Sequence, residues 1–579
     1  MFVTRLFSYL RGYGFRIAIG LTIKTISTFM DLLIPWALSH IIDEVIPNDD
    51  IGQVYLWGIV MLFFCLTAWF GNIIANRMAS SVSRDATERI RYNLFKKISY
   101  LSNADVDRFT IPSLISRMTS DTYSVHHALG MVQRMGIRAP ILLLGGIVIT
   151  MAADPVLTLV MLTVIPLVSV ITFYVSKKGA HLFKIVQIGV DSMVRTVREN
   201  AAGIRVVKAL SKSEYEKQRF HKVNEELMKK EKKAQSVMAF SNPTMTILLN
   251  LGLCAVLAIG AYRVNDGTTQ IGDIIAFMTY FTIILNSIMM MTRIFLNLSK
   301  ASASAERINE VLICSDELSI GTDPKEDTNA PVIEFDNVSF SYDNSKTHSV
   351  FSLSNLSFSI KKGETLGIIG PTGSGKTSII SLLLRFYPVS FGEIKINGVN
   401  INDFTLSTLR KKFGTVLQND TLFYDTIKEN ITFGRNITFD EIKLATNASQ
   451  AYDFIINAGG FESEVAIKGS NFSGGQKQRL LISRALAGNS EILIFDDSFS
   501  ALDYKTDSML REKLHSDFFE KTKIVVTQRV SSVLSAEHIL VLENGKCVGY
   551  GKHNDLIKSC SIYRETAMLQ LGGESVEKK

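Results

Sequence analysis

Cysteine and charged residues are both scarce in this chain of 579 residues. The five cysteines have neither the paired spacing of a zinc site nor that of a disulfide framework, and they are typical of incidental thiols in a reducing compartment. Charged residues make up 20% of the chain and hydrophobic residues 47%, and the mean hydropathy is +0.19. This balance excludes a disordered chain and is too apolar for an ordinary soluble enzyme. We therefore expect membrane spans.

The charge balance is modestly basic. Lys and Arg number 62 and Asp and Glu 55, so the net charge is +7 with histidine neutral. A basic surface is one way to bind nucleic acid, but basic residues held on the cytoplasmic side of a membrane explain this excess more simply. We therefore expect the lipid bilayer as a partner, and no nucleic acid.

Apolar windows occur only in the first part of the chain, and each approaches the roughly 20 residues that a bilayer requires. The two long connections, 77–138 and 177–242, are rich in Lys and Arg, whereas the loops 43–50, 152–155 and 265–273 contain neither. The positive-inside rule then predicts a multi-pass protein with both termini and both long connections in the cytosol. The six predicted spans lie at 15–46, 54–75, 137–153, 156–175, 245–261 and 274–298.

Hydropathy falls at 315–331, where Asp, Thr, Asn and Pro are frequent, and this stretch predicts a linker. The chain before it, 1–314, is predicted to be a six-helix transmembrane domain with long cytoplasmic helical extensions. The chain after it, 332–579, has the length of one soluble domain.

A phosphate-binding loop follows the short apolar run 365–369, which predicts a buried strand, and precedes a helical segment at 378–386. In this GxxxxGK[ST] pattern, backbone N–H groups surround the phosphates at a helix N-terminus, Lys376 meets the β/γ oxygens and the Thr377 hydroxyl reaches Mg²⁺. A second apolar strand, 491–497, ends in acid, and Asp496 is the expected partner of Mg²⁺. The predicted cofactors are ATP and Mg²⁺. The loop residues expected to bind ATP are Gly370, Thr372, Gly373, Ser374, Gly375, Lys376, Thr377 and Ser378.

Between these two motifs, residues 471–480 read Asn-Phe-Ser-Gly-Gly-Gln-Lys-Gln-Arg-Leu. This segment resembles the signature of ATP-binding-cassette (ABC) proteins, and with six preceding spans the chain resembles a half-transporter of the exporter type. The resemblance implies an α-helical transmembrane domain followed by an α/β nucleotide-binding domain at 332–579. It also implies that Tyr342 stacks on adenine, that Gln418 senses Mg²⁺ and that Asp503 lies in a loop coupling two opposed domains.

The signature residues have a physical role of their own. Ser473, Gly474 and Gly475, followed by Gln476, are expected to open a helix whose positive end holds a γ-phosphate. In the family that phosphate belongs to the nucleotide on the opposite domain. The resemblance therefore implies a second half-transporter as partner.

Two positions depart from the family pattern. Where the family normally has a glutamate that polarises the attacking water, this chain has Asp497, and where the family has a switch histidine, it has Gln528. Neutral drift is one interpretation. The other is a site that binds ATP but hydrolyses it poorly, as in one subunit of the heterodimeric bacterial multidrug exporters, which act in the plasma membrane.

Evidence on the substrate is thinner. Segments 109–121 and 198–209 resemble the cytoplasmic coupling segments of exporters. An acid within a span normally faces a cavity or a partner, so Asp31 is a candidate for the substrate cavity, together with Phe281 and Met290 of the sixth window. Packing against lipid is the alternative for the last two. Small amphipathic compounds, including cations, are the expected cargo.

Two other functions are consistent with this pattern, and a third is not. A nucleotide-gated regulatory or channel subunit would bind ATP without pumping, and a homodimeric lipid or peptide exporter would need no distinct partner. A soluble cassette ATPase is excluded by the predicted spans.

Overall fold

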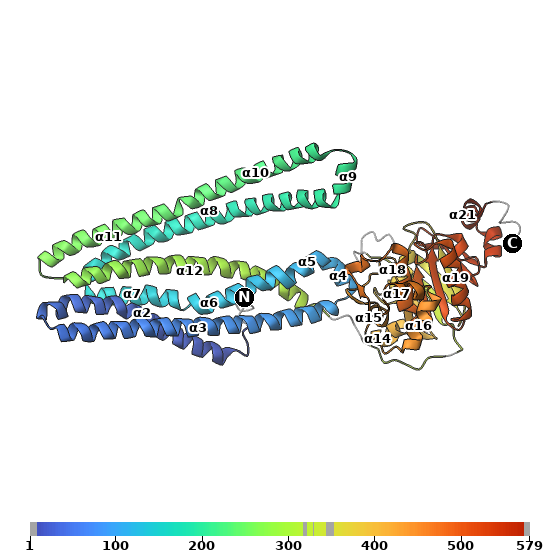
Figure 1. Cartoon of the computed structure of the whole chain (residues 1–579), viewed down its shortest axis with the longest axis horizontal. Coiled ribbons are helices and arrows are strands. Elements are labelled where there is room, and N and C mark those ends of the chain that lie inside the picture. Colours follow the sequence, from blue (N-terminus) through green and yellow to red (C-terminus); the bar gives the residue numbers. More distant parts are fainter. Residues whose placement is uncertain (1–8, 316–320, 328, 343–351, 573–579) are drawn as a thin grey trace. The chain divides into compact units, whose positions relative to one another are not determined.

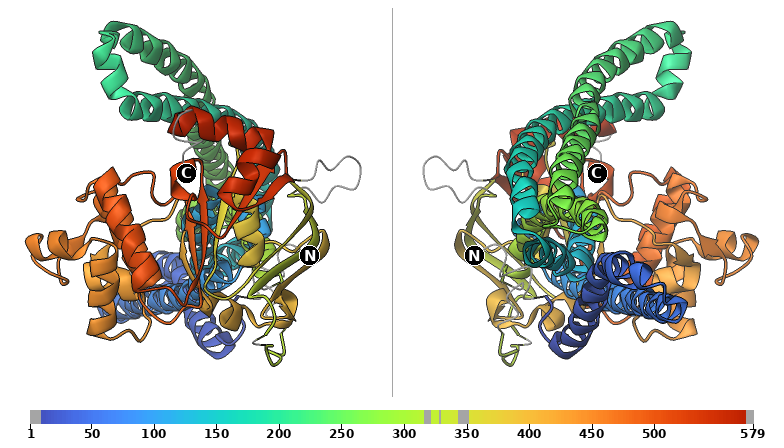
Figure 2. Two further views of the ribbon diagram at one scale, coloured as in Figure 1. Left: turned by 90° about the vertical axis from the view of Figure 1, so that its right-hand side faces the viewer. Right: turned by 90° about the vertical axis from the view of Figure 1, so that its left-hand side faces the viewer.

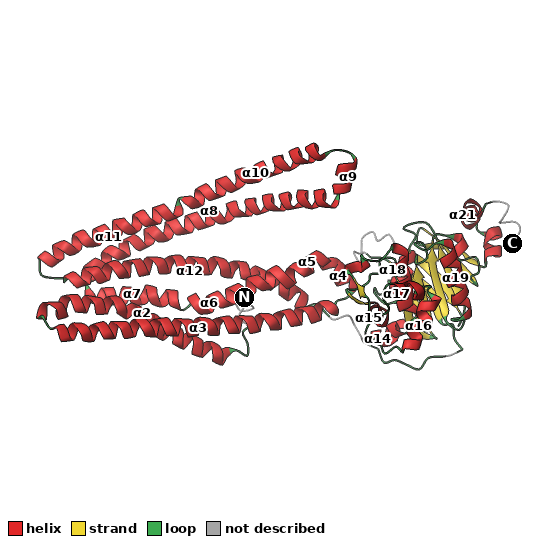
Figure 3. Ribbon diagram, in the orientation of Figure 1, coloured by secondary structure: helices red, strands yellow, loops and turns green. Residues whose placement is uncertain are grey.

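The computed structural model describes residues 9–315, 321–327, 329–342 and 352–572. The chain forms two compact units: Met1–Ser99 with Phe109–Cys314, and Tyr100–Arg108 with Ser315–Lys579. The second unit resumes at Ser315, the first residue of the predicted linker. Residues 316–320 and 328 of that linker lie outside the described residues. Within those residues, every strand belongs to the second unit (Figure 3).

The first unit consists of long helices. The described helices from residue 14 to residue 153 are α2 (Gly14–His40), η1 (Ile41–Val45), η2 (Ile46–Asn48), α3 (Ile51–Ser99), α4 (Asn103–Phe109), α5 (Ile111–Ser116), η3 (Arg117–Asp121), α6 (Thr122–Met135) and α7 (Arg138–Ala153). Those after α7 are α8 (Pro155–Ala202), α9 (Ile204–Ala209), α10 (Ser213–Ala239), α11 (Ser241–Asn265) and α12 (Ile271–Leu312). Helices α8 and α10 run side by side as an arm with α9 at its tip, apart from the C-terminal ends of α3 and α12 (Figures 1 and 2).

Five helical segments of the described chain are long and apolar enough to cross a membrane, and they contain five of the six predicted windows. The remaining window, 156–175, lies in α8, whose described apolar part is the shorter Pro155–Val168. The α-helices continue well past the apolar windows, as the periodicity of the long connections predicts. Helix breaks in these connections lie at Thr110, between α4 and α5, and at Gly203, between α8 and α9.

The first coupling segment differs from the prediction. The resemblance placed it at 109–121, but the segment that groups with the second unit is Tyr100–Arg108, which contains most of α4. Residues 111–121 form α5 and η3 in the first unit instead. Arg117 of η3 donates to the Arg307 carbonyl at 2.9 Å and pairs with Glu310 at 3.0 Å, which ties this segment to α12.

The three short loops between spans meet at one end of the first unit. Asp43 accepts hydrogen bonds from the backbone N–H groups of Gly272 and Asp273, at 2.6 and 3.0 Å. Asp154 caps α8 by accepting from the Val156 N–H at 2.8 Å, and it also pairs with Arg263 at 2.7 Å. These contacts agree with the prediction that loops 43–50, 152–155 and 265–273 share one side of the membrane.

Two charged groups of α2 have polar partners in neighbouring helices. Lys24 is only 2% exposed and donates to the amide oxygens of Asn72 and Asn76, at 2.7 and 3.1 Å. Asp31 forms an ion pair with Arg138 at 3.0 Å. Since an uncompensated charge is costly at this depth, each partner contributes to the packing of α2 against its neighbours.

The second unit is an α/β domain with a six-stranded sheet in the order β12-β11-β3-β10-β9-β6 and a four-stranded sheet in the order β2-β1-β4-β5. Strands β6, β9, β10, β3 and β11 run parallel to one another, and the edge strand β12 is antiparallel to β11. The strands are β1 (Ile333–Phe340), β2 (Leu353–Ile360), β3 (Thr365–Ile369), β4 (Phe391–Ile396), β5 (Val399–Asn400), β6 (Phe413–Val416), β7 (Asp425–Thr426), β8 (Glu464–Val465), β9 (Ile492–Asp496), β10 (Thr522–Thr527), β11 (His538–Glu543) and β12 (Lys546–Gly551).

Helices cover the parallel sheet, whose central strands β3, β9 and β10 are buried along almost their whole length, as expected for strands covered on both faces. The described helices are α13 (Lys376–Leu383), η4 (Ile401–Asp403), α14 (Leu406–Lys411), α15 (Ile427–Thr432), α16 (Phe439–Ala448), α17 (Tyr452–Asn457), η5 (Ile467–Gly469), α18 (Gly474–Leu486), α19 (Tyr504–Ser516), η6 (Val530–Ser532), α20 (His553–Ser559) and α21 (Ser561–Leu571). The parallel order brings the ends of five strands to one edge.

The double role of Asp154 gives a stability prediction. Asp154→Ala removes both the α8 cap and the partner of Arg263, so we expect a loss of about 2–4 kcal/mol in the free energy of unfolding. Asp154→Asn keeps a capping oxygen and should lose less. Thermal denaturation of the purified chain in detergent measures both. Equal midpoints for Asp154→Ala and the unaltered chain would contradict this account.

Candidate nucleotide-binding site

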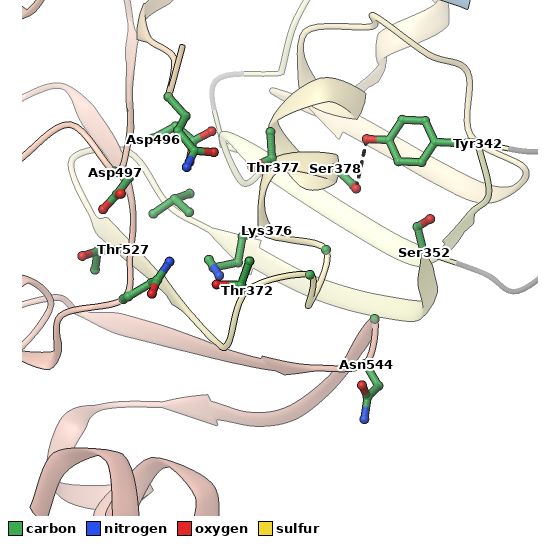
Figure 4. Close-up of a pocket in the computed structure, with 16 residues that line it drawn as sticks. Tyr342, Ser352, Thr372, Lys376, Thr377, Ser378, Asp496, Asp497, Thr527 and Asn544 are labelled. Carbon is green, nitrogen blue, oxygen red and sulfur yellow. Dashed lines mark hydrogen bonds between the residues drawn. The ribbon is translucent and has the colours of Figure 1, made fainter. Parts of the chain in front are cut away.

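A cleft of about 510 Å³ lies at the carboxyl edge of the parallel sheet (Figure 4). Most of its residues follow β3, β6, β9, β10 and β11, whose ends the parallel order brings together although they are distant in sequence, and two come from the connection between β1 and β2 of the other sheet. The lining residues are Tyr342, Ser352, Thr372, Gly373, Gly375, Lys376, Thr377, Ser378, Gln418, Asp496, Asp497, Val526, Thr527, Gln528, Asn544 and Gly545. Eleven of these sixteen are predicted site residues.

The phosphate-binding loop links β3 to α13, as its pattern predicts. Gly373 and Gly375 have φ angles of +82° and +97°, which side chains rarely adopt. A Cβ on Gly370 would lie 2.4 Å from the Leu542 carbonyl oxygen, so that glycine permits close packing against β11 rather than lining the cleft. Ser374 is also outside the cleft lining and buried, and its Oγ has no hydrogen-bond partner among the described residues.

Lys376 lies inside the loop. Its Nζ donates to the carbonyl oxygens of Gly370 and Pro371, at 2.7 and 2.8 Å. Burial lowers the pKa of Lys376, while the carboxylates of Asp496 and Asp497 act in the opposite direction. The ammonium group thus donates to two neutral carbonyl oxygens, and a phosphate would be a stronger acceptor for it.

Asp496 ends β9 and faces Thr377 and Gln418 across the cleft. It is 2% exposed, and its Oδ2 has no hydrogen-bond partner among the described residues. Burial, followed by the charge of Asp497, raises the pKa of Asp496 to about 6. An orphaned carboxylate oxygen beside a hydroxyl and an amide oxygen is a donor set that fits Mg²⁺, which prefers oxygen ligands.

Tyr342 stands at the other end of the cleft, on the chain that leaves β1. Tyr342 is 52% exposed. Its hydroxyl shares a hydrogen bond with Ser378 Oγ at 3.1 Å, which is drawn in Figure 4. An exposed aromatic ring whose hydroxyl is held in place can stack on a base.

The two departures from the family pattern both line the cleft. Asp497 has a φ of +49°, and its backbone N–H donates to the Val526 carbonyl at 2.9 Å. Gln528 follows β10, and its carbonyl accepts from Nε2 of Gln570 in α21 at 2.9 Å. Gln570 Oε1 also accepts from the Val530 N–H at 2.8 Å, so one side chain holds the backbone on both sides of Arg529.

The signature does not line this cleft. Ser473 caps α18 by accepting from the Gln476 N–H at 3.3 Å, and Gln476 Oε1 accepts from the Ser473 N–H at 2.9 Å. Ser473 and Gly474 are exposed, and a Cβ on Gly474 would meet nothing within 4 Å. Asp503 caps α19, where the Thr506 backbone N–H holds the pKa of that carboxyl below its ordinary value. The capping box preorganises an open helix N-terminus.

The structure also brings in residues that sequence reasoning missed. Ser352, Val526, Thr527, Asn544 and Gly545 line the cleft. Asn544 and Gly545 form the turn after β11, which ends a parallel strand at the same edge of the sheet. If the strand order were known, this turn in the sequence would have located both residues. Gln570 has no such local signal.

The three candidate substrate residues differ in their surroundings and in their exposure. Asp31 is paired with Arg138, and Met290 is partly buried. Phe281 is 0% exposed and packs with Leu157, Met161 and Val256. Its ring fills the space between helices in this chain rather than lining an open surface.

Comparison with known proteins agrees with this architecture. Residues 17–288 match the ABC transporter transmembrane region and residues 353–500 match the ABC transporter family. The chain is 34% identical to the ABC transporter ATP-binding protein YfiB of Bacillus subtilis over 573 residues, 98% of this chain and 99% of that protein. It is 28% identical to the ATP-dependent lipid A-core flippase of Haemophilus ducreyi over 577 residues, 98% of this chain and 97% of that one.

A solved structure of a bacterial Atm1-family ABC exporter with ATP bound has the same fold, with a TM-score of 0.80 at 24% identity over 96% of this chain and 98% of that chain. The fold and the site thus define a membrane transporter with its own ATP-binding domain. The chain belongs to the ABC transporter family, as a half-transporter of the exporter type with one transmembrane and one nucleotide-binding domain.

The position of Lys376 gives a binding prediction. Lys376→Ala removes the one lysine among the described residues that line the cleft, so we expect the affinity of the chain for Mg-ATP to fall at least about tenfold. Lys362→Ala, at an exposed lysine before β3, is the matched control. Titration with a fluorescent ATP analogue measures both. Equal affinities for the two variants would show that ATP does not bind at this loop.

Proposed function

We propose that this chain binds ATP and Mg²⁺ in its own cleft but hydrolyses ATP poorly there, and that it completes a competent site on a second, different half-transporter. The observation that carries the proposal is the pairing of Asp497 and Gln528 in one cleft whose binding elements are all present. The bound Mg²⁺ would neutralise phosphate charge, with Thr377, Gln418 and Asp496 holding it. Hydrolysis would then depend on how the remaining groups place a water molecule.

Asp497 is poorly suited to that task. Its side chain is one methylene shorter than glutamate, and a misplacement of about 1 Å costs about 10²-fold in rate. The backbone cannot easily move to compensate, because the Asp497 N–H is hydrogen-bonded to β10 and Ser500 Oγ donates to the Asp497 carbonyl at 2.9 Å. The Asp497 carboxylate therefore lies farther from the expected position of the γ-phosphate than a glutamate carboxylate would.

Gln528 weakens the same step. A neutral amide cannot carry the positive charge of a histidine or reproduce its ring geometry. The clamp from Gln570 holds the backbone of Gln528, so the loop is ordered for contact with the nucleotide even though its side chain contributes no charge. Both losses affect hydrolysis and leave binding intact.

The exposed signature supports a partner-built site. Ser473, Gly474 and the end of α18 offer hydroxyl and N–H groups outside this chain's cleft. In the family these groups contact the nucleotide of the opposite domain, so an intact signature is useful only to a partner. A partner with glutamate and histidine at the two altered positions would make the pair competent.

We further propose that the pair exports small amphipathic compounds, including drugs, across a bacterial plasma membrane, with both termini in the cytosol. The basic long connections support this orientation. Asp31 and Met290 remain candidates for the substrate cavity. Because Arg138 compensates the charge of Asp31, a cationic substrate would have to compete with that arginine.

Two alternatives have specific support. The relation to the lipid A-core flippase of Haemophilus ducreyi favours a homodimeric lipid exporter, which would need two active copies of the cleft described here. The altered pair Asp497 and Gln528 favours a nucleotide-gated regulator, which would bind ATP without any turnover. The regulator would remain inactive as an ATPase with every partner.

The ATPase activity of the pair separates these functions. Gly474→Asp should abolish most turnover of the pair, because it places a negative charge where the partner's γ-phosphate binds. It should not disturb folding, since the position is open and an acid at a helix N-terminus is favourable. Asp497→Asn should change the rate by less than about twofold, because that carboxylate already contributes little base positioning.

The matched control is the partner's own catalytic glutamate changed to glutamine, which should remove most activity. Equal losses from Asp497→Asn and from the partner change would contradict the asymmetric account and favour two equivalent sites. Absence of turnover in any heteromeric complex would favour the regulator.

A further inference from the structure

Tyr387, in the loop between α13 and β4, packs against the exposed ring of Tyr342. The two ring centroids are 5.1 Å apart with an interplanar angle of 83°, an edge-to-face contact. Phe340 closes the cluster, with its ring 4.7 Å from Tyr342 and 5.8 Å from Tyr387. Such pairs prefer this geometry and contribute energy beyond the area they bury. The plane of Tyr342 is thus set by Tyr387 and Phe340, and its hydroxyl by Ser378.

The hydroxyl of Tyr387 donates a hydrogen bond to Asp107, a residue 280 positions earlier in the chain. Asp107 belongs to α4, and Tyr100–Arg108 groups with the nucleotide-binding unit. Burial, and then the bond to Asp107, raise the pKa of Tyr387, so its hydroxyl keeps its proton and remains a donor. The segment that carries Asp107 continues directly from α3, which holds a candidate span.

These contacts form one connected set. The base-stacking ring touches Tyr387, Tyr387 holds Asp107, and Asp107 lies on the short helix that follows a membrane-spanning one. A change in the position of α4 must therefore either break the Tyr387 hydrogen bond or move the Tyr387 ring. Moving that ring removes the edge that fixes Tyr342.

We infer that Tyr387 is a positioning residue for base recognition and couples occupancy of the adenine platform at Tyr342 to the seating of α4 through Asp107. The inference rests on the proposed function only in that the adenine of ATP stacks on Tyr342. Coupling of this kind is reciprocal: a seated α4 raises ATP affinity, and bound ATP holds α4 in place by the same factor. Through this coupling, a site that hydrolyses ATP poorly can still affect α4 when ATP binds.

The test compares two ligands that differ in the base. Mg-ATP and Mg-tripolyphosphate share the phosphate contacts, but only ATP uses the platform. In the full-length chain in lipid nanodiscs, Tyr387→Phe and Asp107→Ala should each weaken Mg-ATP by about threefold, as expected for one hydrogen bond to a charged group near the surface. Neither should change the affinity for Mg-tripolyphosphate. The double variant should lose no more than either single one, because both remove the same bond.

Tyr550→Phe is the matched control, because the Tyr550 hydroxyl donates to the Ser359 carbonyl at 2.7 Å and Tyr550 does not line the cleft. It should leave both affinities unchanged. Hydrogen exchange supplies the second readout: ATP should slow exchange at 103–109 in the unaltered chain and not in Tyr387→Phe. A purely structural role for Tyr387 would not produce this ligand-dependent difference.

The inference is overturned if Tyr387→Phe leaves Mg-ATP affinity unchanged, if it weakens tripolyphosphate equally, or if ATP protects 103–109 equally with and without the hydroxyl. Tyr342→Ala separates this failure from that of the platform itself. If that variant binds ATP as tightly as the unaltered chain, adenine does not stack on Tyr342. That result would contradict both the adenine platform and the role of Tyr387. None of these readouts depends on whether the cleft hydrolyses ATP.

Discussion

The nucleotide-binding unit depends on the burial of β3, β9 and β10 on both faces of a parallel sheet. Parallel strands end at the same edge, so burial of these apolar runs brings the phosphate loop, Asp496 and Gln528 into one cleft. The strands supply the rigidity and the loops supply the chemistry. A change in loop residues, such as Asp497 or Gln528, can therefore alter hydrolysis without altering the fold.

In the membrane half, paired polar groups have the corresponding role. Lys24 is held by two asparagines of α3, and Asp31 by Arg138 of α7. At the loop end, Asp43 and Asp154 tie neighbouring connections together. Because polar groups in a span are costly unless paired, these bonds specify which helices adjoin α2 and α8 more narrowly than apolar packing does.

Much of this could be predicted where the signal is local. The glycine loop, the acid after β9 and the signature are contiguous patterns with a physical reason for their spacing, and five of six predicted windows are long apolar helices. Contacts between residues that are far apart in the sequence have no such local pattern. Tyr387 and Asp107 lie 280 positions apart and Asp31 and Arg138 107 apart, so neither pairing was predictable from one sequence. Phe281 was assigned to a cavity because a helix sequence does not tell which apolar face is covered by neighbouring helices.

The central claim is that ATP bound to this chain stays intact. The most direct measurement is the fate of that nucleotide: the complex is incubated with radiolabelled 8-azido-ATP, cross-linked by light, and the label on this chain is analysed as ATP or ADP. The account predicts that ATP predominates, and that the double variant Asp497→Glu with Gln528→His shifts the label to ADP. Conversion to ADP in the unaltered chain as fast as in that variant would contradict it.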